Sequence, residues 1–107
     1  MTSPERHPPN TSISIDDNGF SLSRISVRWS TVRTIATYKW DLWSYDDICL
    51  AFQVAEDSWA EVSEDEPGFR ELVVEVERRY PSVPRDWFNS VVHPAFETNY
   101  RVLWRGE

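Results

Sequence analysis

The first third of the chain alternates apolar and polar positions with the period of two that β-strands show. Residues 12–23 (SISIDDNGFSLS) place apolar side chains at alternate positions on both sides of Asp-Asn-Gly, which favours a tight hairpin turn. Residues 25–29 continue the alternation, and residues 32–39 are rich in β-branched and aromatic side chains. This region therefore predicts a series of antiparallel strands.

A longer strand is predicted after Asp46. One face would carry Ile48, Leu50, Phe52 and Val54, and the other would carry Cys49, Ala51 and Gln53. Because the side chains of the second face are small and fairly apolar, this segment is expected to be a central strand of the sheet. A turn at residues 56–58 and a last strand at residues 59–63 follow.

The period then changes from two to 3.6, which predicts an amphipathic helix over residues 66–80. Its apolar face consists of Phe69, Leu72, Val73, Val76 and Tyr80. Acids at residues 64–66 and arginines at residues 78–79 suit the two ends of the helix dipole. Pro67 fits the first turn and Pro81 follows the last.

Residues 84–92 (PRDWFNSVV) predict a short second helix with Trp87, Phe88, Val91 and Val92 directed inward. Residues 100–105 alternate again and suggest a final strand. Residues 1–11 are rich in Pro, Ser and Thr and are expected to form a disordered tail. The ordered part, residues 12–107, is expected to be a single α+β domain, because its strands precede its helices.

Composition narrows the class of protein. The chain has 107 residues, one cysteine and a net charge of −7. One cysteine cannot form an internal disulfide, and no apolar run has the length of a membrane span or a signal peptide, so a cytoplasmic location is expected. The negative charge argues against nucleic acids and anionic membranes as partners.

Residues 13–39 resemble the opening of small bacterial pleckstrin-homology-like domains. The resemblance is carried by GF at residues 19–20, VRW at residues 27–29, and the spacing of Val32 and Ile35. It implies a strongly bent antiparallel sheet closed by a C-terminal helix. The wider pattern, YKWDL, DDICLAF, EVSEDEPGF, DWF and PAFETN, is similar to uncharacterised bacterial proteins of about this length. This resemblance implies a fold and brings no activity with it.

Catalytic, cofactor and metal motifs are absent from the sequence. The two histidines, His7 and His93, are far apart, and no HExxH or CxxC spacing occurs. Residues 14–19 mimic the start of a calcium loop, but Ile25 stands where the bidentate Glu belongs, so a hairpin turn is favoured. Cys49 lies between Ile48 and Leu50 and is expected to be a small buried residue. We therefore expect no enzymatic activity and no cofactor.

The stretch TYKWDLWSYDDICL, residues 37–50, concentrates aromatic and acidic side chains. In a hairpin, Tyr38 and Trp40 share one face, as do Trp43 and Tyr45, so one pair can belong to the core while the other is exposed. Exposed aromatic side chains beside acids are typical of protein interfaces. They also suit a small-ligand cleft near Trp40, Asp41 and Asp46, which is the alternative interpretation.

Charge is distributed unevenly along the chain. Residues 18–40 contain four basic residues and no acid, whereas residues 56–77 contain nine of the eighteen acids. This acidic region is either a solvated face or a surface that steers a basic partner.

The sequence thus favours a protein-binding module, comparable to an immunity protein or an adaptor, over a ligand-binding or enzymatic domain. A basic protein is the expected partner, and a homodimer is compatible with the exposed aromatic residues. The candidate partner-binding residues are Trp40, Asp41, Trp43, Tyr45, Glu61, Glu64, Asp65 and Glu66.

Overall fold

The computed structural model describes residues 13–41, 46–92 and 99–106. Within these ranges the protein is α+β, with two β-sheets and two α-helices, and every described strand pairing is antiparallel. The expected α+β class is confirmed. The strands form two sheets rather than the one bent sheet that was expected, because a 3₁₀ turn at Trp29–Thr31 separates them. The predicted tail, residues 1–11, lies outside the described residues.

The first sheet has three strands in the order β1 (Ser14–Ile15), β2 (Gly19–Leu22) and β3 (Ile25–Arg28). The predicted hairpin turn is confirmed between β1 and β2. Asp16 Oδ1 accepts hydrogen bonds from the backbone N–H groups of Asn18, at 2.8 Å, and Gly19, at 3.0 Å. This carboxylate thus stabilises the turn in the way that Asp side chains commonly do.

The second sheet has four strands, β4 (Thr34–Asp41), β5 (Asp46–Ala55), β6 (Ser58–Ser63) and β7 (Arg101–Arg105). Its order is β6-β5-β4-β7, so β5 is a central strand, as its two apolar faces predicted. The predicted final strand is also confirmed. It follows both helices in sequence and pairs with β4, so the chain does not end on helices.

The two helices are α1 (Phe69–Arg79) and α2 (Trp87–Val92). The predicted apolar face of α1 is buried at Phe69, Leu72 and Val76. In α2, Trp87 and Val91 are buried, but Phe88 is 39% exposed, so its predicted inward orientation is wrong. The physical reason is geometric: positions i and i+4 share one face of a helix, and the position after Trp87 is turned about 100° away from it.

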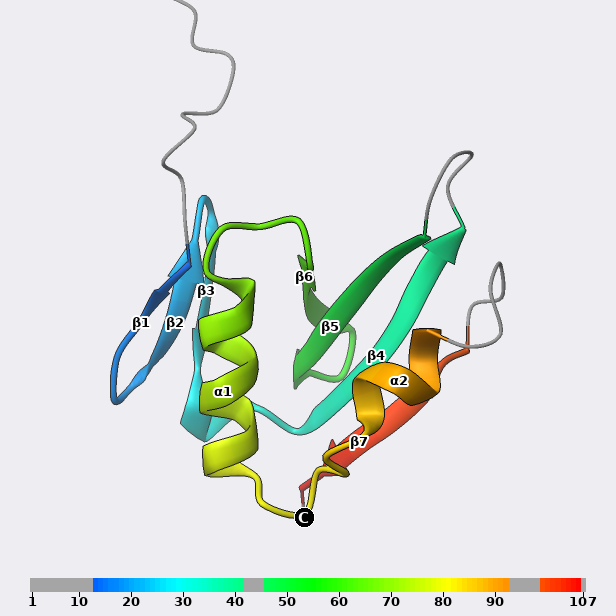
Figure 1. The fold of residues 1–107 in the computed structure, drawn as a ribbon. Helices are drawn as coiled ribbons and strands as arrows, with labels where there is room; N and C mark the ends of the chain where they lie inside the picture. The colour runs from blue at the N-terminus through cyan, green and yellow to red at the C-terminus, as the bar shows by residue number, and fades with distance from the viewer. Residues whose placement is uncertain (1–12, 42–45, 93–98, 107) are drawn as a thin grey trace, which may run out of the picture.

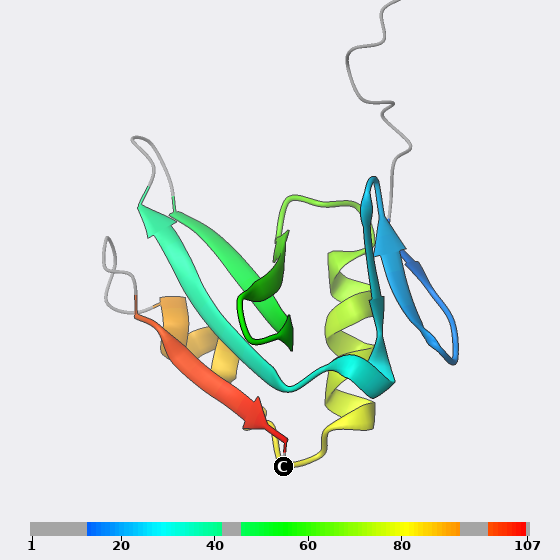
Figure 2. The same cartoon turned by 180° about the vertical axis from the view of Figure 1, so that it is seen from behind.

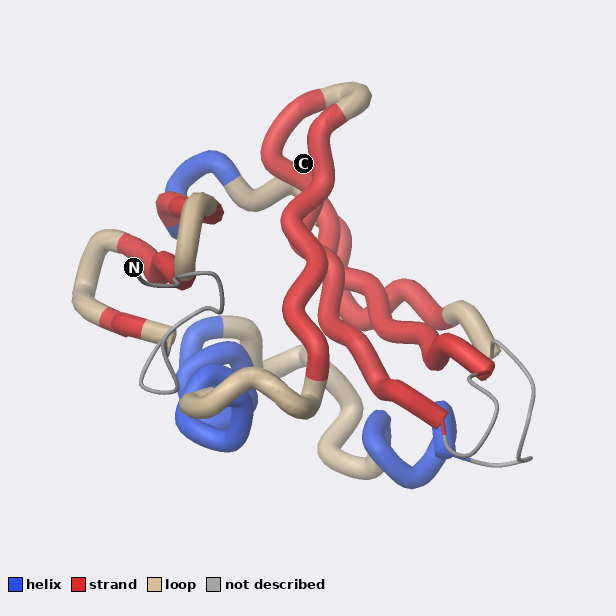
Figure 3. The backbone as a smooth tube through the Cα atoms, turned by 90° about the horizontal axis from the view of Figure 1, so that it is seen from above, coloured by secondary structure: helices blue, strands red, loops and turns tan. Residues whose placement is uncertain are grey.

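Both helices lie on the same side of the four-stranded sheet (Figures 1 and 3). Helix α1 stands in the angle between the two sheets, and α2 lies against β4. Seen from behind, the opposite face of the four-stranded sheet has no helix over it (Figure 2). One face of this sheet is therefore inner, and the other, which we call the outer face, is directed away from the helices.

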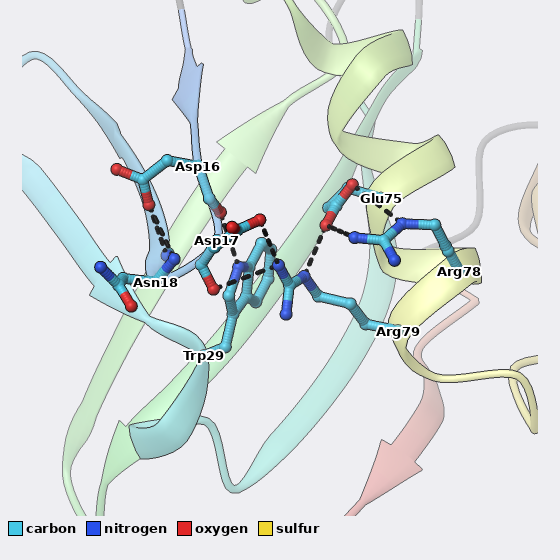
Figure 4. Close-up of polar contacts among 8 residues, drawn as sticks. Asp16, Asp17, Asn18, Trp29, Glu75, Arg78 and Arg79 are labelled. Atoms are coloured by element: carbon cyan, nitrogen blue, oxygen red, sulfur yellow. Dashed lines mark hydrogen bonds and ion pairs between the residues drawn. The ribbon is translucent and has the colours of Figure 1, made fainter.

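A polar cluster joins α1 to the β1–β2 turn (Figure 4). Arg79 Nε lies 2.6 Å from Glu75 Oε2, and Arg79 Nη2 donates to the carbonyl oxygen of Asp17 at 3.2 Å. The same guanidinium lies 4.8 Å from the ring centroid of Trp29. Arg78 also pairs with Glu75, and these bonds lower the pKa of that carboxyl. This cluster fixes the end of α1 against the first sheet.

We expect Gly19→Ala to destabilise the first sheet. A Cβ at this position would lie 1.9 Å from the carbonyl oxygen of Val27, which belongs to the paired strand. Relieving this overlap requires displacement of β2 from β3, at a cost of about 2 kcal/mol or more in the free energy of unfolding. Urea denaturation checks this. The matched control is Ser21→Ala on the same strand, and equal midpoints for the two variants would contradict the prediction.

Candidate functional site

The outer face of the four-stranded sheet brings together two of the predicted site residues, Trp40 and Glu61. Tyr38 and Trp40 lie on this face of β4, and the residues directly opposite them on β5 are Cys49 and Asp47. Glu61 of β6 lies opposite Ala51. Because residues directly opposite one another in a sheet share a face, all these side chains belong to the outer face.

Glu61 crosses the central strand to reach the aromatic residues of β4. Its Oε2 accepts hydrogen bonds from the Tyr38 hydroxyl, at 2.6 Å, and from Trp40 Nε1, at 3.0 Å. This crossing is feasible because β5 carries only the small side chains of Cys49 and Ala51 beneath it. Both small residues are buried although they lie on the outer face, which shows that the larger side chains cover them.

The aromatic rings on this face form a continuous group. Tyr38 meets Trp40 edge to face, with centroids 6.0 Å apart, and stacks on Tyr100 at 6.1 Å with 11° between the ring planes. Trp40 is 52% exposed and Tyr100 is 55% exposed. We call Tyr38, Trp40, Glu61 and Tyr100 the outer-face cluster. It offers wide aromatic surface to solvent around one carboxylate.

The electrostatics of the cluster favour a neutral phenol at Tyr38. Burial is the main cause that raises the pKa of Tyr38 above its ordinary value, and the hydrogen bond to Glu61 adds to it. Tyr38 therefore remains a hydrogen-bond donor at neutral pH. The ion pairs between described residues involve Glu75, Glu77 and Asp17 as acids, and Glu61 is in none of them. Glu61 is thus held by neutral donors alone.

The predicted acids at residues 64–66 do not join this cluster. Glu64 Oε2 accepts a hydrogen bond from the backbone N–H of Ile48 at 3.1 Å, and burial raises the pKa of Glu64. Asp65 is exposed, and Glu66 lines a cavity beside α1. The residues predicted as one surface therefore occupy two places, one on the outer face and one at the end of the sheet near α1.

Part of the predicted site lies outside the described residues. This holds for Trp43 and Tyr45, and for His93. The backbones of Asp41 and Asp46 pair with each other at the ends of β4 and β5. A small-ligand cleft near Trp40, Asp41 and Asp46 stays a prediction, because it borders residues 42–45.

Among the described residues, the arginines of residues 18–40 do not neutralise the acidic region through direct ion pairs. Within the described chain, Arg24, Arg28 and Arg33 take part in no ion pair. Glu75 and Glu77 of α1 pair instead with Arg78, Arg79 and Arg85, which are near them in sequence.

Cys49 has the environment of a structural residue. Its side chain is buried, and its Sγ lies 3.9 Å from the backbone oxygen and from Oδ2 of Asp47. Burial, followed by the charge of Asp47, raises the pKa of the thiol to about 12. A thiol with so high a pKa carries almost no thiolate at neutral pH, and the thiolate is the nucleophilic form.

Sequence reasoning missed Tyr38 and Tyr100 as members of the site. The alternation of β4 already placed Tyr38 on the same face as Trp40, so this signal was available. No local signal indicated Tyr100, because its position depends on the pairing of β7 with β4.

Comparison with protein-family models, with curated proteins and with solved structures finds no match for this chain. Within the described ranges, no group of three or more His, Cys, Asp or Glu side chains is arranged to hold a metal ion. Neither of the two described helices has the length and apolar character that a membrane crossing requires.

Cys49 is expected to resist alkylation in the folded protein. At pH 8, a thiol with a pKa of about 12 is ionised to about one part in ten thousand. Iodoacetamide should therefore modify the native protein at least about a hundredfold more slowly than the protein unfolded in urea, as followed by mass spectrometry. Native and unfolded rates within a few fold of each other would show that the thiol is accessible and activated.

Proposed function

We propose that this protein is a non-enzymatic binding module that recognises a basic partner protein through its outer-face cluster. The observation that carries the proposal is the position of Glu61. Its carboxylate is fixed on an exposed sheet face by Tyr38 and Trp40, and no cation of the described chain pairs with it. A carboxylate held in this way is ready to accept a cation from another molecule.

The chemistry of the cluster suits an arginine of the partner. A guanidinium can pair with a carboxylate and stack on an aromatic ring at the same time. The protein uses this combination internally, where Arg79 contacts the Glu75 carboxylate and the ring of Trp29 (Figure 4). Exposed Trp and Tyr side chains supply the large contact area that interface anchors have.

The acidic region supports the proposal through longer-range electrostatics. The net charge is −7, and residues 56–77 contain half of the acids. Such a field raises the association rate of a basic protein and disfavours nucleic acids. Glu61 is a better candidate for direct contact than Glu64, because Glu64 is hydrogen-bonded to the sheet backbone.

The proposal also covers the kind of binding protein this is and its location in the cell. An immunity-like or adaptor-like role in the cytoplasm fits a small acidic module that binds a basic protein. A pleckstrin-homology-like arrangement is part of the proposal, supported by the helix that follows six antiparallel strands. The return of the chain as β7 departs from the simple form of that fold.

The variant that tests the proposal is Glu61→Gln, which keeps an oxygen acceptor for Tyr38 and Trp40 and removes the charge. We expect the tagged wild-type protein to retain one stoichiometric basic protein from a lysate of its own source at low salt. The Glu61→Gln variant should bind that purified protein about tenfold more weakly, as measured by biolayer interferometry.

The matched control is Asp57→Asn, which removes the same charge from the exposed β5–β6 turn. It should change affinity by less than about twofold, because a distant exposed charge is screened. Equal affinities for the Glu61→Gln and wild-type proteins would refute the outer-face cluster as the site. Light scattering of the isolated protein distinguishes a second copy of the chain from a different partner.

A further inference from the structure

A second surface, separate from the outer-face cluster, lies between the two helices. An open cavity of about 520 Å³ runs between α1, α2 and the segment that leads into α1. Its volume is within the range of natural binding pockets, about 300–1,000 Å³. We call it the interhelical groove. Both helices lie on the inner side of the four-stranded sheet (Figures 1 and 3). Because residues of both helices line the groove, it lies on the other side of that sheet from the outer-face cluster.

The middle of the groove is apolar. Phe69 and Val73 of α1 and Trp87 and Phe88 of α2 line it. Phe69 and Trp87 are buried, whereas Phe88 is 39% exposed and packs edge to face on Trp87, with centroids 5.6 Å apart. An exposed phenylalanine at the wall of a cavity supplies apolar surface that a bound side chain could cover.

At the end of the groove near the C-terminus of α1, the charge of Glu77 is neutralised by Arg85. Its Oε2 accepts a hydrogen bond from Trp87 Nε1 at 3.1 Å, and its Oε1 lies 3.2 Å from Arg85 Nη1. Arg85 also donates to the backbone oxygen of Glu77 at 3.3 Å. These bonds connect α1 to the residues around α2. The groove therefore has a fixed geometry at this end.

The other end of the groove carries an excess of negative charge. With Glu77 and Arg85 paired, the remaining charged residues of the wall are Glu64, Glu66, Glu71 and Arg70. Three acids thus stand against one base, and no described ion pair involves any of them. An apolar middle with one acidic end is complementary to an apolar side chain next to a lysine or arginine.

We propose that the interhelical groove binds a basic amphipathic segment of a partner protein. The apolar side chains of that segment rest on Phe69, Val73 and Phe88, and its basic side chains lie beside Glu66 and Glu71. This is the mode in which an amphipathic helix enters a hydrophobic groove. The site is a second one, and it does not require the outer-face cluster.

The test uses three synthetic peptides and the ¹⁵N-labelled full chain. The first contains three Lys-Leu-Ala-Lys repeats, the second replaces every lysine by glutamate, and the third replaces every leucine by serine. We expect the first peptide to shift the amide signals of Phe69, Val73 and Phe88 and the indole signal of Trp87. The other two should bind at least about tenfold more weakly, because each lacks one half of the complementarity.

Two pairs of variants separate the groove from the rest of the surface. Phe88→Ser should weaken the first peptide about tenfold, whereas Val74→Ser, which alters an exposed valine of α1 outside the groove, should not. Glu71→Lys should lower the affinity for the first peptide about threefold, whereas Glu56→Lys in the β5–β6 turn should leave that affinity unchanged. Unchanged signals elsewhere in each spectrum verify the fold of each variant.

Either of two results would overturn the proposal. One is that the third peptide, in which serine replaces leucine, binds as tightly as the first peptide. The attraction would then be electrostatic only. The other is a set of shifts confined to Tyr38, Trp40 and Glu61, since the peptide would then occupy the outer-face cluster. Glu61→Gln should leave groove binding unchanged, so failure of the proposed function and failure of this inference are distinguishable.

Discussion

The packing of Tyr80 between Trp29 and Trp104 is the interaction on which the arrangement of the two sheets depends. Tyr80 follows α1, Trp29 begins the 3₁₀ turn after the first sheet, and Trp104 belongs to β7 of the second sheet. The ring centroids of Tyr80 and Trp104 are 4.5 Å apart, and those of Tyr80 and Trp29 are 6.4 Å apart. Phe20 joins the sheets directly by its contact with Phe52, at 4.8 Å. Large aromatic rings bury much surface per residue, so a short chain can join two sheets and a helix through a few of them.

This core determines which surfaces remain for binding. The inner face of the four-stranded sheet is occupied by the helices and the first sheet, and even Lys39 is buried there, with its Nζ donating to the Val92 oxygen at 2.6 Å. The outer face receives no such cover from the described chain. Its central strand carries small side chains, so the residues of β4 and β6 lie across it and form an organised exposed surface. Candidate binding residues therefore follow from what the core leaves uncovered.

Local patterns in the sequence predicted much of this structure. The hairpin at Asp16 to Gly19, the buried face of α1 and the central position of β5 depend on residues close together in the chain, and all three are confirmed. The features that were missed depend on pairing between distant segments. The alignment of β7 with β4 places Tyr100 on Tyr38, and the separation into two sheets depends on how Trp29 packs. Periodicity shows which face of an element is apolar, but it does not show which distant element will cover that face.

The contrast between Glu75 and Glu61 explains why Glu75 is assigned a structural role, whereas Glu61 is the acid that we propose for recognition. Glu75 is compensated by two arginines of its own helix, which lower its pKa, and its charge serves the packing of α1. Glu61 is oriented by two neutral donors, which fix the carboxylate without cancelling its charge. Orientation by neutral groups on an exposed face leaves the electrostatic attraction free for a cation from outside, and it reduces the entropy lost when that cation binds. A charge that the fold positions but does not neutralise is the physical basis of the recognition that we propose for the outer face.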